Sequence, residues 1–210
     1  RSYLVENGAT GEVLLAHDAR ERVPIASITK LMTVLLTLEH TRPNETVVVN
    51  PAAAAVGESS ADLGPGERLT VRELLEAALI QSANDAADAL AYYVGHGSES
   101  RFVAMMNARA RQLGLRNTHY VRPDGLDAPG HVSSARDVTL LARILMHLGP
   151  LPPVGDLSTR EALDAVKRDK KVVDGTLHYV LCTKIGGWTT VSDVTEEELG
   201  KAFRKVGLKK

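Results

Sequence analysis

The spacing of apolar residues along the first forty positions predicts two short strands followed by a buried helix. Apolar runs at 3–5 and 13–16 flank a Gly-rich segment, which is typical of two strands joined by a turn. Beyond Pro24, apolar residues recur with helical spacing, at Ile28, Leu31, Met32, Leu35, Leu36 and Leu38. We therefore expect a mostly buried helix that begins near Ser27.

A second pattern, between residues 70 and 95, predicts two consecutive helices. Thr70 and Glu73 have the spacing of a capping box, in which two side chains satisfy N–H groups at the start of a helix. The first helix runs into a polar segment that contains Ser82 and Asn84, and the second helix ends at Gly95. Ser82 and Asn84 thus lie at a break between helices, where side chains can project into a cleft.

Composition and charge limit the class of protein. The chain has 210 residues and a mass of 22.6 kDa, which is room for one large domain or two small ones. Its 44% apolar content is ordinary for a packed core, so disorder is excluded. With 25 Lys and Arg against 26 Asp and Glu, the formal charge is −1, and a nucleic-acid partner has little support.

Three features bear on redox state and location. Cys182 is the single cysteine, so no disulfide can form within the chain. No apolar run approaches the roughly 18 to 20 residues that a membrane-spanning helix needs. The chain begins at Arg1 without a methionine or an apolar leader, so we expect a soluble chain from which processing or protein design removed any preceding segment.

The basic residues change type along the chain, which predicts a boundary. Positions 1–148 hold thirteen Arg and one Lys, whereas positions 149–210 hold three Arg and eight Lys. The change coincides with a helix-ending glycine and prolines that cannot continue a helix, Gly149-Pro150-Leu151-Pro152-Pro153. We expect a first segment at 1–148, a junction at 149–155 and a tail at 156–210, which could still pack into the same domain. Local surface bias within one domain is the alternative interpretation.

Lys30 is the single lysine of the first segment and lies three positions after Ser27. An Arg guanidinium keeps its proton in proteins, whereas a desolvated Lys amine can lose its proton and act as a base. At helical spacing the two side chains lie one turn apart on one face, and the helix dipole favours negative charge near the first turn. The alternative is that Ser27 simply caps the helix.

The segment Ser82-Ala83-Asn84, taken alone, is most simply a polar turn with a capping serine or asparagine. Its occurrence together with Ser27 and Lys30 favours a catalytic function instead. A serine nucleophile needs a base beside it and further polar groups around the reacting carbonyl.

Together these motifs resemble the serine D-alanyl-D-alanine carboxypeptidases, low-molecular-mass penicillin-binding proteins, over residues 1 to about 146. Five segments carry the resemblance: Thr10-Gly11-Glu12-Val13-Leu14, Ala26-Ser27-Ile28-Thr29-Lys30-Leu31-Met32-Thr33, Gln81-Ser82-Ala83-Asn84-Asp85-Ala86-Ala87, Pro123-Asp124-Gly125-Leu126-Asp127 and Ser133-Ser134-Ala135-Arg136-Asp137. The resemblance implies an α+β fold of the serine β-lactamase and DD-peptidase type, an antiparallel sheet flanked by helices, incomplete or recombined at the C-terminus.

The same resemblance implies roles for four residues. Ser27 would attack the carbonyl of a terminal D-Ala-D-Ala peptide bond and form an acyl-enzyme that water hydrolyses. Lys30 would take the hydroxyl proton. Ser82 would relay a proton to the leaving amine, and Asn84 would hold the substrate amide. The partners would be peptidoglycan peptides or β-lactams, met outside the cytoplasmic membrane, with no cofactor and with an oligomeric state that the sequence does not indicate.

The family's third motif, Lys-Thr-Gly on a strand, has a counterpart in Thr183-Lys184-Ile185-Gly186-Gly187. Ile185 replaces the threonine and offers no hydroxyl to a substrate carboxylate. On this assignment Lys184, Gly186 and Gly187 bind substrate. Lys184 supplies positive charge, and the N–H of Gly187 forms an oxyanion hole with the N–H of Ser27.

A second resemblance, to the C-terminal end of dehydroquinate synthase, covers residues from about 156 to 208. It rests on Ala165-Val166-Lys167-Arg168-Asp169-Lys170-Lys171, Asp174-Gly175-Thr176-Leu177-His178-Tyr179-Val180-Leu181 and Asp193-Val194-Thr195-Glu196-Glu197-Glu198-Leu199. On this interpretation the likeness of Lys184-Ile185-Gly186 to the peptidase motif is accidental. Synthase activity is not expected, because the metal-binding residues and dinucleotide-binding segment of that family have no counterpart in the sequence.

Local patterns predict the elements of the tail. These are a helix from Ser158 to about Arg168, extended segments at 172–173, 177–183 and 189–191, and a last helix capped by Thr195 and Glu198. The seven histidines show no metal-ligand spacing, so no metal site is expected. The competing function is a catalytically silent recombinant, in which the peptidase-like segment serves as a scaffold.

Overall fold

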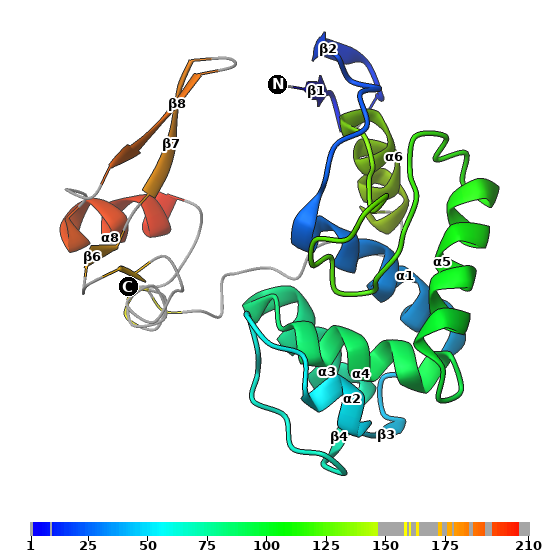
Figure 1. The fold of residues 1–210 in the computed structure, drawn as a ribbon. Coiled ribbons are helices and arrows are strands. Elements are labelled where there is room, and N and C mark those ends of the chain that lie inside the picture. Colours follow the sequence, from blue (N-terminus) through cyan, green and yellow to red (C-terminus); the bar gives the residue numbers. More distant parts are fainter. Residues whose placement is uncertain are drawn as a thin grey trace. The chain divides into compact units, whose positions relative to one another are not determined.

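The computed structural model describes residues 2–8, 10–146, 158, 160, 163, 172–173, 176–177, 179–184, 187–191 and 195–205. The chain divides into two compact units, Arg1–Gly149 and Pro150–Lys210 (Figure 1). The described strands pair two by two, and every pair is antiparallel. Helices of the first unit supply most of its core.

The first unit opens with the predicted pair of strands, β1 (Tyr3–Glu6) and β2 (Val13–His17). Tyr3 pairs with His17 in the ladder, and the rings of the two residues stack. β2 is largely exposed, whereas β1 is mostly half-buried. An ion pair from Glu6 to Arg143 joins β1 to helix α6 (Ala135–Met146), against which β1 packs. The prediction of a hairpin at this position is confirmed.

The predicted buried helix is present as α1 (Lys30–His40), preceded by a single 3₁₀ turn, Ala26–Thr29. Ser27 therefore lies inside this turn, one residue after Ala26, whose φ of +47° is in the left-handed region. Neither Ile25 nor Thr29, the residues at the two helix starts, makes a capping side-chain hydrogen bond. The interpretation of Ser27 as a helix cap is therefore wrong.

A second group of elements follows α1. It comprises β3 (Thr46–Val48), α2 (Pro51–Ala54), β4 (Arg68–Thr70), α3 (Val71–Glu76), a π-helical turn (Ala77–Gln81) and α4 (Asn84–Val94). The predicted capping box at Thr70 and Glu73 is formed, with both reciprocal hydrogen bonds. Gly95 follows the last residue of α4, as the sequence predicts. The break between the helices falls at residues 82 and 83.

Helix α4 is buried along almost its whole length because it lies between two apolar clusters. On one side Leu90 packs with Val47, Val71 and Leu74. On the other side Ala91 and Val94 join the cluster formed by α1, α5 (Glu99–Gln112) and α6, which contains Met32, Leu35, Phe102, Met106, Tyr120 and Leu141. The first residues of α1 and α4 are consequently held in one rigid framework.

The second unit contains β5 (Val172–Val173), β6 (Thr176–Leu177), β7 (Tyr179–Lys184), β8 (Gly187–Val191) and α8 (Glu196–Lys205). Pairing of β5 with β6 and of β7 with β8 agrees with the predicted extended segments. Thr195 and Glu198 form the predicted capping box. The helix expected from Ser158 to Arg168 lies largely outside the described residues.

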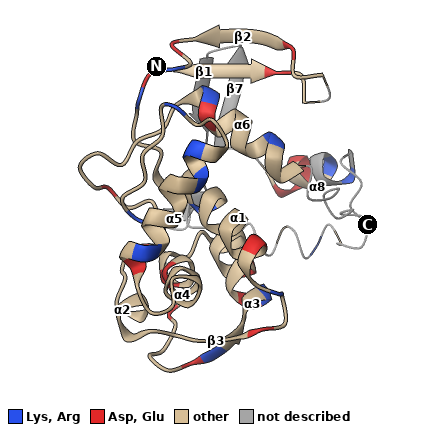
Figure 2. Cartoon of the chain, turned by 90° about the vertical axis from the view of Figure 1, so that its right-hand side faces the viewer, with Lys and Arg blue, Asp and Glu red and all other residues tan. Residues whose placement is uncertain are grey.

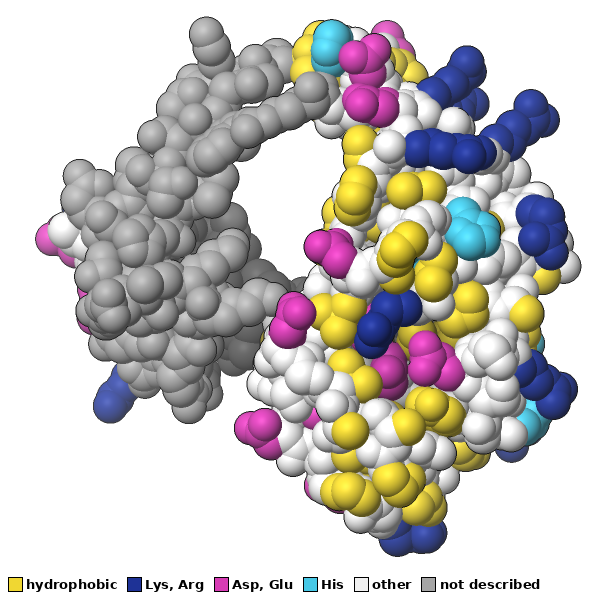
Figure 3. Space-filling model, in the orientation of Figure 1, with side chains coloured by type: hydrophobic (Ala, Val, Ile, Leu, Met, Phe, Trp, Pro, Cys, Tyr) yellow, Lys and Arg dark blue, Asp and Glu magenta, His cyan; other side chains and the backbone are white. Residues whose placement is uncertain are grey.

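Charge is spread over the first unit. Lys and Arg alternate with Asp and Glu along its ribbon (Figure 2), and the face in Figure 3 shows charged side chains interspersed with hydrophobic ones. This distribution agrees with the near-zero formal charge and gives no continuous basic surface on that face. Among the helices that the structure describes, none is long and apolar enough to cross a membrane.

Candidate active site

The Lys30 amine connects three segments that are far apart in the sequence. Lys30 is 2% exposed, and its Nζ lies 3.2 Å from Ser27 Oγ, 2.7 Å from Asn84 Oδ1 and 2.7 Å from the carbonyl oxygen of Asp124. Ser27 is itself exposed, so the hydroxyl is open to a substrate while the amine is covered. Two of the sequence motifs therefore meet in space, through Ser27, Lys30 and Asn84.

The two shortest contacts of Lys30 decide how its protons are used. Asn84 Oδ1 and the Asp124 carbonyl can only accept hydrogen bonds, so each takes one N–H of the amine. A neutral amine has two N–H groups and one lone pair. In the structure Nζ donates to Ser27 Oγ as well. A neutral amine that keeps its two N–H groups on Asn84 Oδ1 and the Asp124 carbonyl would have its lone pair available for the Ser27 hydroxyl proton. The geometry therefore suits a base that acts on Ser27.

Asn84 is fixed on both sides. Its Nδ2 donates to the carbonyl of Gly57 at 3.1 Å, and its backbone N–H donates to the carbonyl of Ser59 at 2.7 Å. The neighbouring Asp85 accepts hydrogen bonds from Ser60 and from the backbone of Ala61 and Leu63. Burial alone would raise the pKa of Asp85, but these hydrogen bonds lower it below its ordinary value.

Ser82 lies where the π-helical turn gives way to α4. Its φ of +60° and ψ of +33° place it in the left-handed region, a conformation that non-glycine residues rarely adopt. Its Oγ is buried and makes no hydrogen bond within the described residues. A buried hydroxyl without a partner is costly, so this group suits a bound ligand that completes its hydrogen bonding.

A loop at residues 121–131 supplies the third contact of Lys30, and His131 organises it. The backbone N–H groups of Val121 and Arg122 both donate to His131 Nδ1, so the ring proton lies on Nε2 and donates to Thr29 Oγ1 at 2.7 Å. Burial lowers the pKa of His131 below its ordinary value. His131 therefore joins the loop to the turn that carries Ser27.

The sequence did not reveal the roles of Asp124, Thr29 and His131 in this site. The signal available was the turn sequence Pro123-Asp124-Gly125, which the resemblance included without assigning it a role. Asp124 acts toward Lys30 through its carbonyl, which any residue could supply. Its carboxylate instead forms a two-point ion pair with the Arg122 guanidinium, at 2.7 and 3.1 Å.

The predicted third motif lies in the second unit. Lys184 ends β7 and Gly187 begins β8, and the two residues are paired in the ladder. Gly186 lies outside the described residues. Ser27, Lys30 and Asn84 are thus brought together within the first unit, and Ser82 lies two positions before Asn84. The roles of these four residues, and the assignment of Lys184, Gly186 and Gly187 to the same site, stay predictions.

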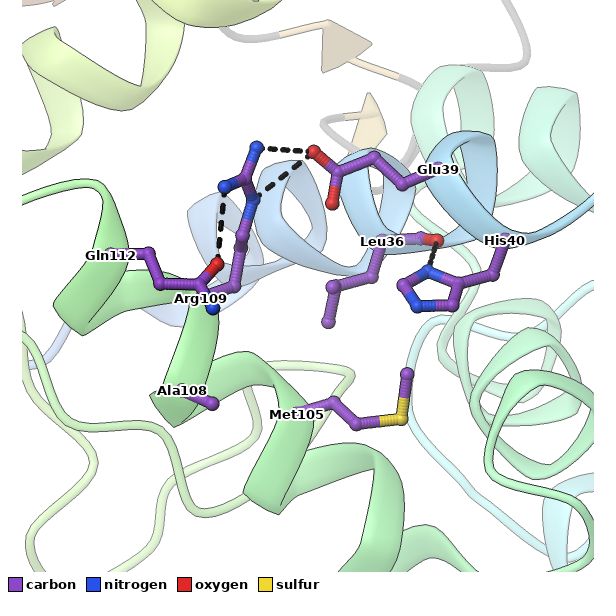
Figure 4. A pocket seen from close by; sticks show the side chains of 7 residues that line it. All are labelled: Leu36, Glu39, His40, Met105, Ala108, Arg109 and Gln112. Carbon is purple, nitrogen blue, oxygen red and sulfur yellow. Dashed lines mark hydrogen bonds and ion pairs between the residues drawn. The ribbon is translucent and has the colours of Figure 1, made fainter.

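Among the hollows of the first unit, two adjoin helix α1 or the turn that precedes it. One, of about 310 Å³, is lined by Ala26, Gly125 and His131 among others, beside the turn that carries Ser27. The other, between α1 and α5, is shown in Figure 4; there Arg109 bonds to Glu39 and Gln112. Within the described residues no group of three His, Cys, Asp or Glu side chains could hold a metal ion.

Comparison with known proteins gives a consistent result. The family model of D-alanyl-D-alanine carboxypeptidases, peptidase S11, matches residues 1–167. The D-alanyl-D-alanine carboxypeptidase DacF of Bacillus subtilis is 42% identical over 142 residues, which are 65% of this chain and 36% of DacF. DacC of Escherichia coli is 39% identical over 158 residues, 70% of this chain and 39% of DacC. The chain thus spans well under half the length of these two relatives.

Solved structures agree. Penicillin-binding protein 6B of Escherichia coli matches with a TM-score of 0.65 and 36% identity, covering 70% of this chain and 49% of that protein. A D-alanyl-D-alanine carboxypeptidase of Mycobacterium tuberculosis matches with a TM-score of 0.67 and 27% identity, covering 94% and 67%. The predicted fold class, α+β of the serine β-lactamase and DD-peptidase type, is confirmed.

Proposed function

Because the chain belongs to the D-alanyl-D-alanine carboxypeptidase family, we propose that it is a serine DD-peptidase, which cleaves the D-Ala-D-Ala ends of peptidoglycan stem peptides through an acyl-enzyme on Ser27. One observation carries this proposal: the buried Lys30 amine lies 3.2 Å from Ser27 Oγ and also contacts two acceptor-only oxygens, Asn84 Oδ1 and the Asp124 carbonyl oxygen. Peptidoglycan lies outside the cytoplasmic membrane, so the protein would act there.

The proposed reaction uses the residues as follows. Ser27 Oγ attacks the carbonyl carbon of the terminal peptide bond while its proton passes to Lys30. The carbonyl oxygen gains negative charge, which the backbone N–H of Ser27 stabilises. Ser82 then delivers its hydroxyl proton to the nitrogen of the departing D-alanine and takes the proton held by Lys30 in its place, which returns the amine to its neutral form. The Ser82 Oγ makes no hydrogen bond within the described residues, so no other group competes for it there. Asn84 holds the substrate amide, and water hydrolyses the ester.

Lys184, Gly186 and Gly187 belong to the proposal as the substrate-binding side. Lys184 would attract the terminal carboxylate of the peptide, and the N–H of Gly187 would be the second donor to the carbonyl oxygen. Removing one such donor in other acyl-transfer enzymes costs roughly 3 to 4 kcal/mol of transition-state stabilisation. Support for this part is the family's motif pattern and the pairing of Lys184 with Gly187 across the β7–β8 hairpin.

Covalent labelling with a fluorescent penicillin tests the proposal, because a β-lactam would acylate the same serine. We expect one label on the wild-type protein and none on Ser27→Ala. The matched control is Ser100→Ala, which removes an exposed hydroxyl from α5 and should leave labelling unchanged. A folded wild-type protein without label would favour the silent scaffold instead.

The origin of the tail is a separate proposal. The change from Arg to Lys at the junction supports a tail at 156–210 of different history, with its likeness to dehydroquinate synthase. The carboxypeptidase family model extends to residue 167, past the junction at 149–155, which supports a tail that belongs to the peptidase. Lys184→Ala in the full chain discriminates between these two origins. We expect slower penicillin labelling, because a tail that belongs to the peptidase would use Lys184 to bind substrate. Unchanged labelling would support a fused tail.

A further inference from the structure

A buried carboxyl group lies behind the proposed active site. Asp88 follows Asn84 by one turn of α4 and is 2% exposed. Its Oδ1 makes no hydrogen bond within the described residues. An ionised carboxylate in such a place is unfavourable, because burial removes the hydration of its charge and no hydrogen-bond donor of the described residues meets Oδ1. Burial, followed by the charges of Asp124 and Glu99, raises the pKa of Asp88 to about 8.

Charged groups from several elements act on this carboxyl. Asp124 and Glu99 disfavour its ionisation, Arg122 and Lys30 favour it, and Tyr92 is the further titratable group that interacts with it. The Asp124 carboxylate is already neutralised by its two-point ion pair with Arg122. The charges of Asp124 and Arg122 cancel each other. A protonated Asp88 therefore adds no negative charge to the cluster.

Two hydrogen bonds of the Lys30 amine lead to residues beside or within this cluster. Lys30 donates to Asn84 Oδ1, one turn before Asp88, and to the carbonyl of Asp124, whose carboxylate belongs to the cluster. A negative charge at Asp88 would stabilise the ammonium form of Lys30 in surroundings that screen charge poorly. An ammonium group cannot accept the proton of Ser27.

We propose that Asp88 is a positioning residue for the reaction proposed above, whose protonated carboxyl keeps uncompensated negative charge away from the Lys30 amine so that the amine can act as the base toward Ser27. This inference rests on the proposed function. It assigns Asp88 a role through Lys30 and no contact with the substrate. Raising the pH increases the fraction of Lys30 that is a neutral amine. Ionisation of Asp88 above neutral pH then opposes this increase, because its negative charge stabilises the ammonium form of Lys30.

The test is the pH profile of penicillin acylation, measured as a second-order rate constant from pH 6 to 10. Asp88→Asn cannot ionise, so it should match the wild type at pH 7 and exceed it above pH 8. If ionisation of Asp88 raises the pKa of Lys30 by about half a unit, acylation of Asp88→Asn should be about threefold faster than that of the wild type at pH 9. The matched control, Glu76→Gln, removes an exposed carboxylate from α3 and should keep the wild-type profile.

The outcomes separate the two proposals. Wild-type protein that fails to react with penicillin at every pH overturns the proposed function and this inference with it. Wild-type protein that reacts, with an Asp88→Asn profile of identical shape or lowered by one factor at all pH values, overturns only the role of Asp88. Carbon-13 NMR of labelled aspartate in Ser27→Ala gives a second readout: an Asp88 signal that ionises near pH 4 also contradicts the inference.

Discussion

The carbonyl oxygen of Ala26 occupies the space in which a side chain at Gly125 would begin. A Cβ built on Gly125 would lie far inside van der Waals contact with that oxygen, and Gly125 has a φ of +87°. Ala26 precedes the nucleophile, and Gly125 follows the residue whose carbonyl accepts from Lys30. One backbone contact therefore positions both Ser27 and the acceptor that orients its base.

Gly125→Ala should abolish penicillin labelling and destabilise the protein. The left-handed conformation alone costs about 1 to 3 kcal/mol for a non-glycine residue, and the collision with Ala26 adds to it. Urea unfolding and labelling rates measure the two effects. Gly130→Ala is the matched control, because Gly130 has a similar φ of +81° but no atom closer than 4.0 Å to its added Cβ. Equal effects of both substitutions would show that the contact with Ala26 is unimportant.

Lys30→Arg should lower the rate of acylation about 100-fold or more, the usual contribution of a general base, while the protein stays folded. The guanidinium keeps the positive charge but cannot give up a proton at accessible pH. Stopped-flow labelling gives the rate, and Lys201→Arg on α8 is the control for the same substitution at an exposed position. A rate within a few-fold of wild type would rule out Lys30 as the base.

Protonation of His131 should reduce stability in mild acid. Nδ1 accepts from two backbone N–H groups, so a proton on this atom breaks both bonds. The pKa of His131 is lowered in the folded state relative to about 6.5 in the unfolded chain. The unfolded state then holds more of the proton at His131 below pH 6.5, and the contribution of His131 to the free energy of unfolding falls as pH decreases through that range.

Urea titrations at pH 7.5, 6.5 and 5.5 measure this effect. In His131→Gln, we expect a lower stability than in the wild type at pH 7.5, and a difference between the two proteins that shrinks toward pH 5.5. The exposed His96 serves as the comparison, because His96→Gln should leave the pH dependence as it is. A stability difference between wild type and His131→Gln that is the same at pH 7.5 and 5.5 would contradict the predicted loss of the two Nδ1 hydrogen bonds in mild acid.

Asp88 should change the pH dependence of stability in the direction opposite to His131. Its pKa is about 8 in the folded state and near 3.9 in the unfolded chain, so the folded state binds the extra proton between these values. Stability is therefore lost as pH rises from about 4 to 8. Asp88→Asn should unfold at a higher temperature than wild type at pH 8 and show little difference at pH 4, as differential scanning calorimetry would reveal.

Local signals in the sequence predicted local structure well. The strands at 3–6 and 13–17 and the capping boxes at Thr70 and Thr195 depend on neighbouring residues, whose preferences are visible in the sequence. The position of Ser27 beside Lys30 followed from helical spacing. The alternative in which Ser27 caps the helix is wrong because a 3₁₀ turn, closely approached by the distant Gly125, precedes the helix.

Long-range contacts were beyond local patterns. The bond from Lys30 to the Asp124 carbonyl spans 94 positions, and the bond from Thr29 to His131 spans 102. Any residue has a backbone carbonyl, so residue type does not reveal which carbonyl accepts a hydrogen bond. A histidine that forms hydrogen bonds within the core has no characteristic spacing from other residues in the sequence. The buried state of Asp88 arises from packing of α4 on both faces, although the residue occupies a helical position that could equally face solvent.

The π-helical turn at Ala77–Gln81 sets the rotation of everything that follows it. Each residue turns a helix by about 100°, so deleting one residue from this segment would swing the start of α4 and carry Asn84 out of reach of Lys30. Substitutions at the exposed Leu79 and Ile80 leave that rotation unchanged. The length of this segment thus determines whether Asn84 reaches Lys30, and the number of its residues matters more for that contact than their identity.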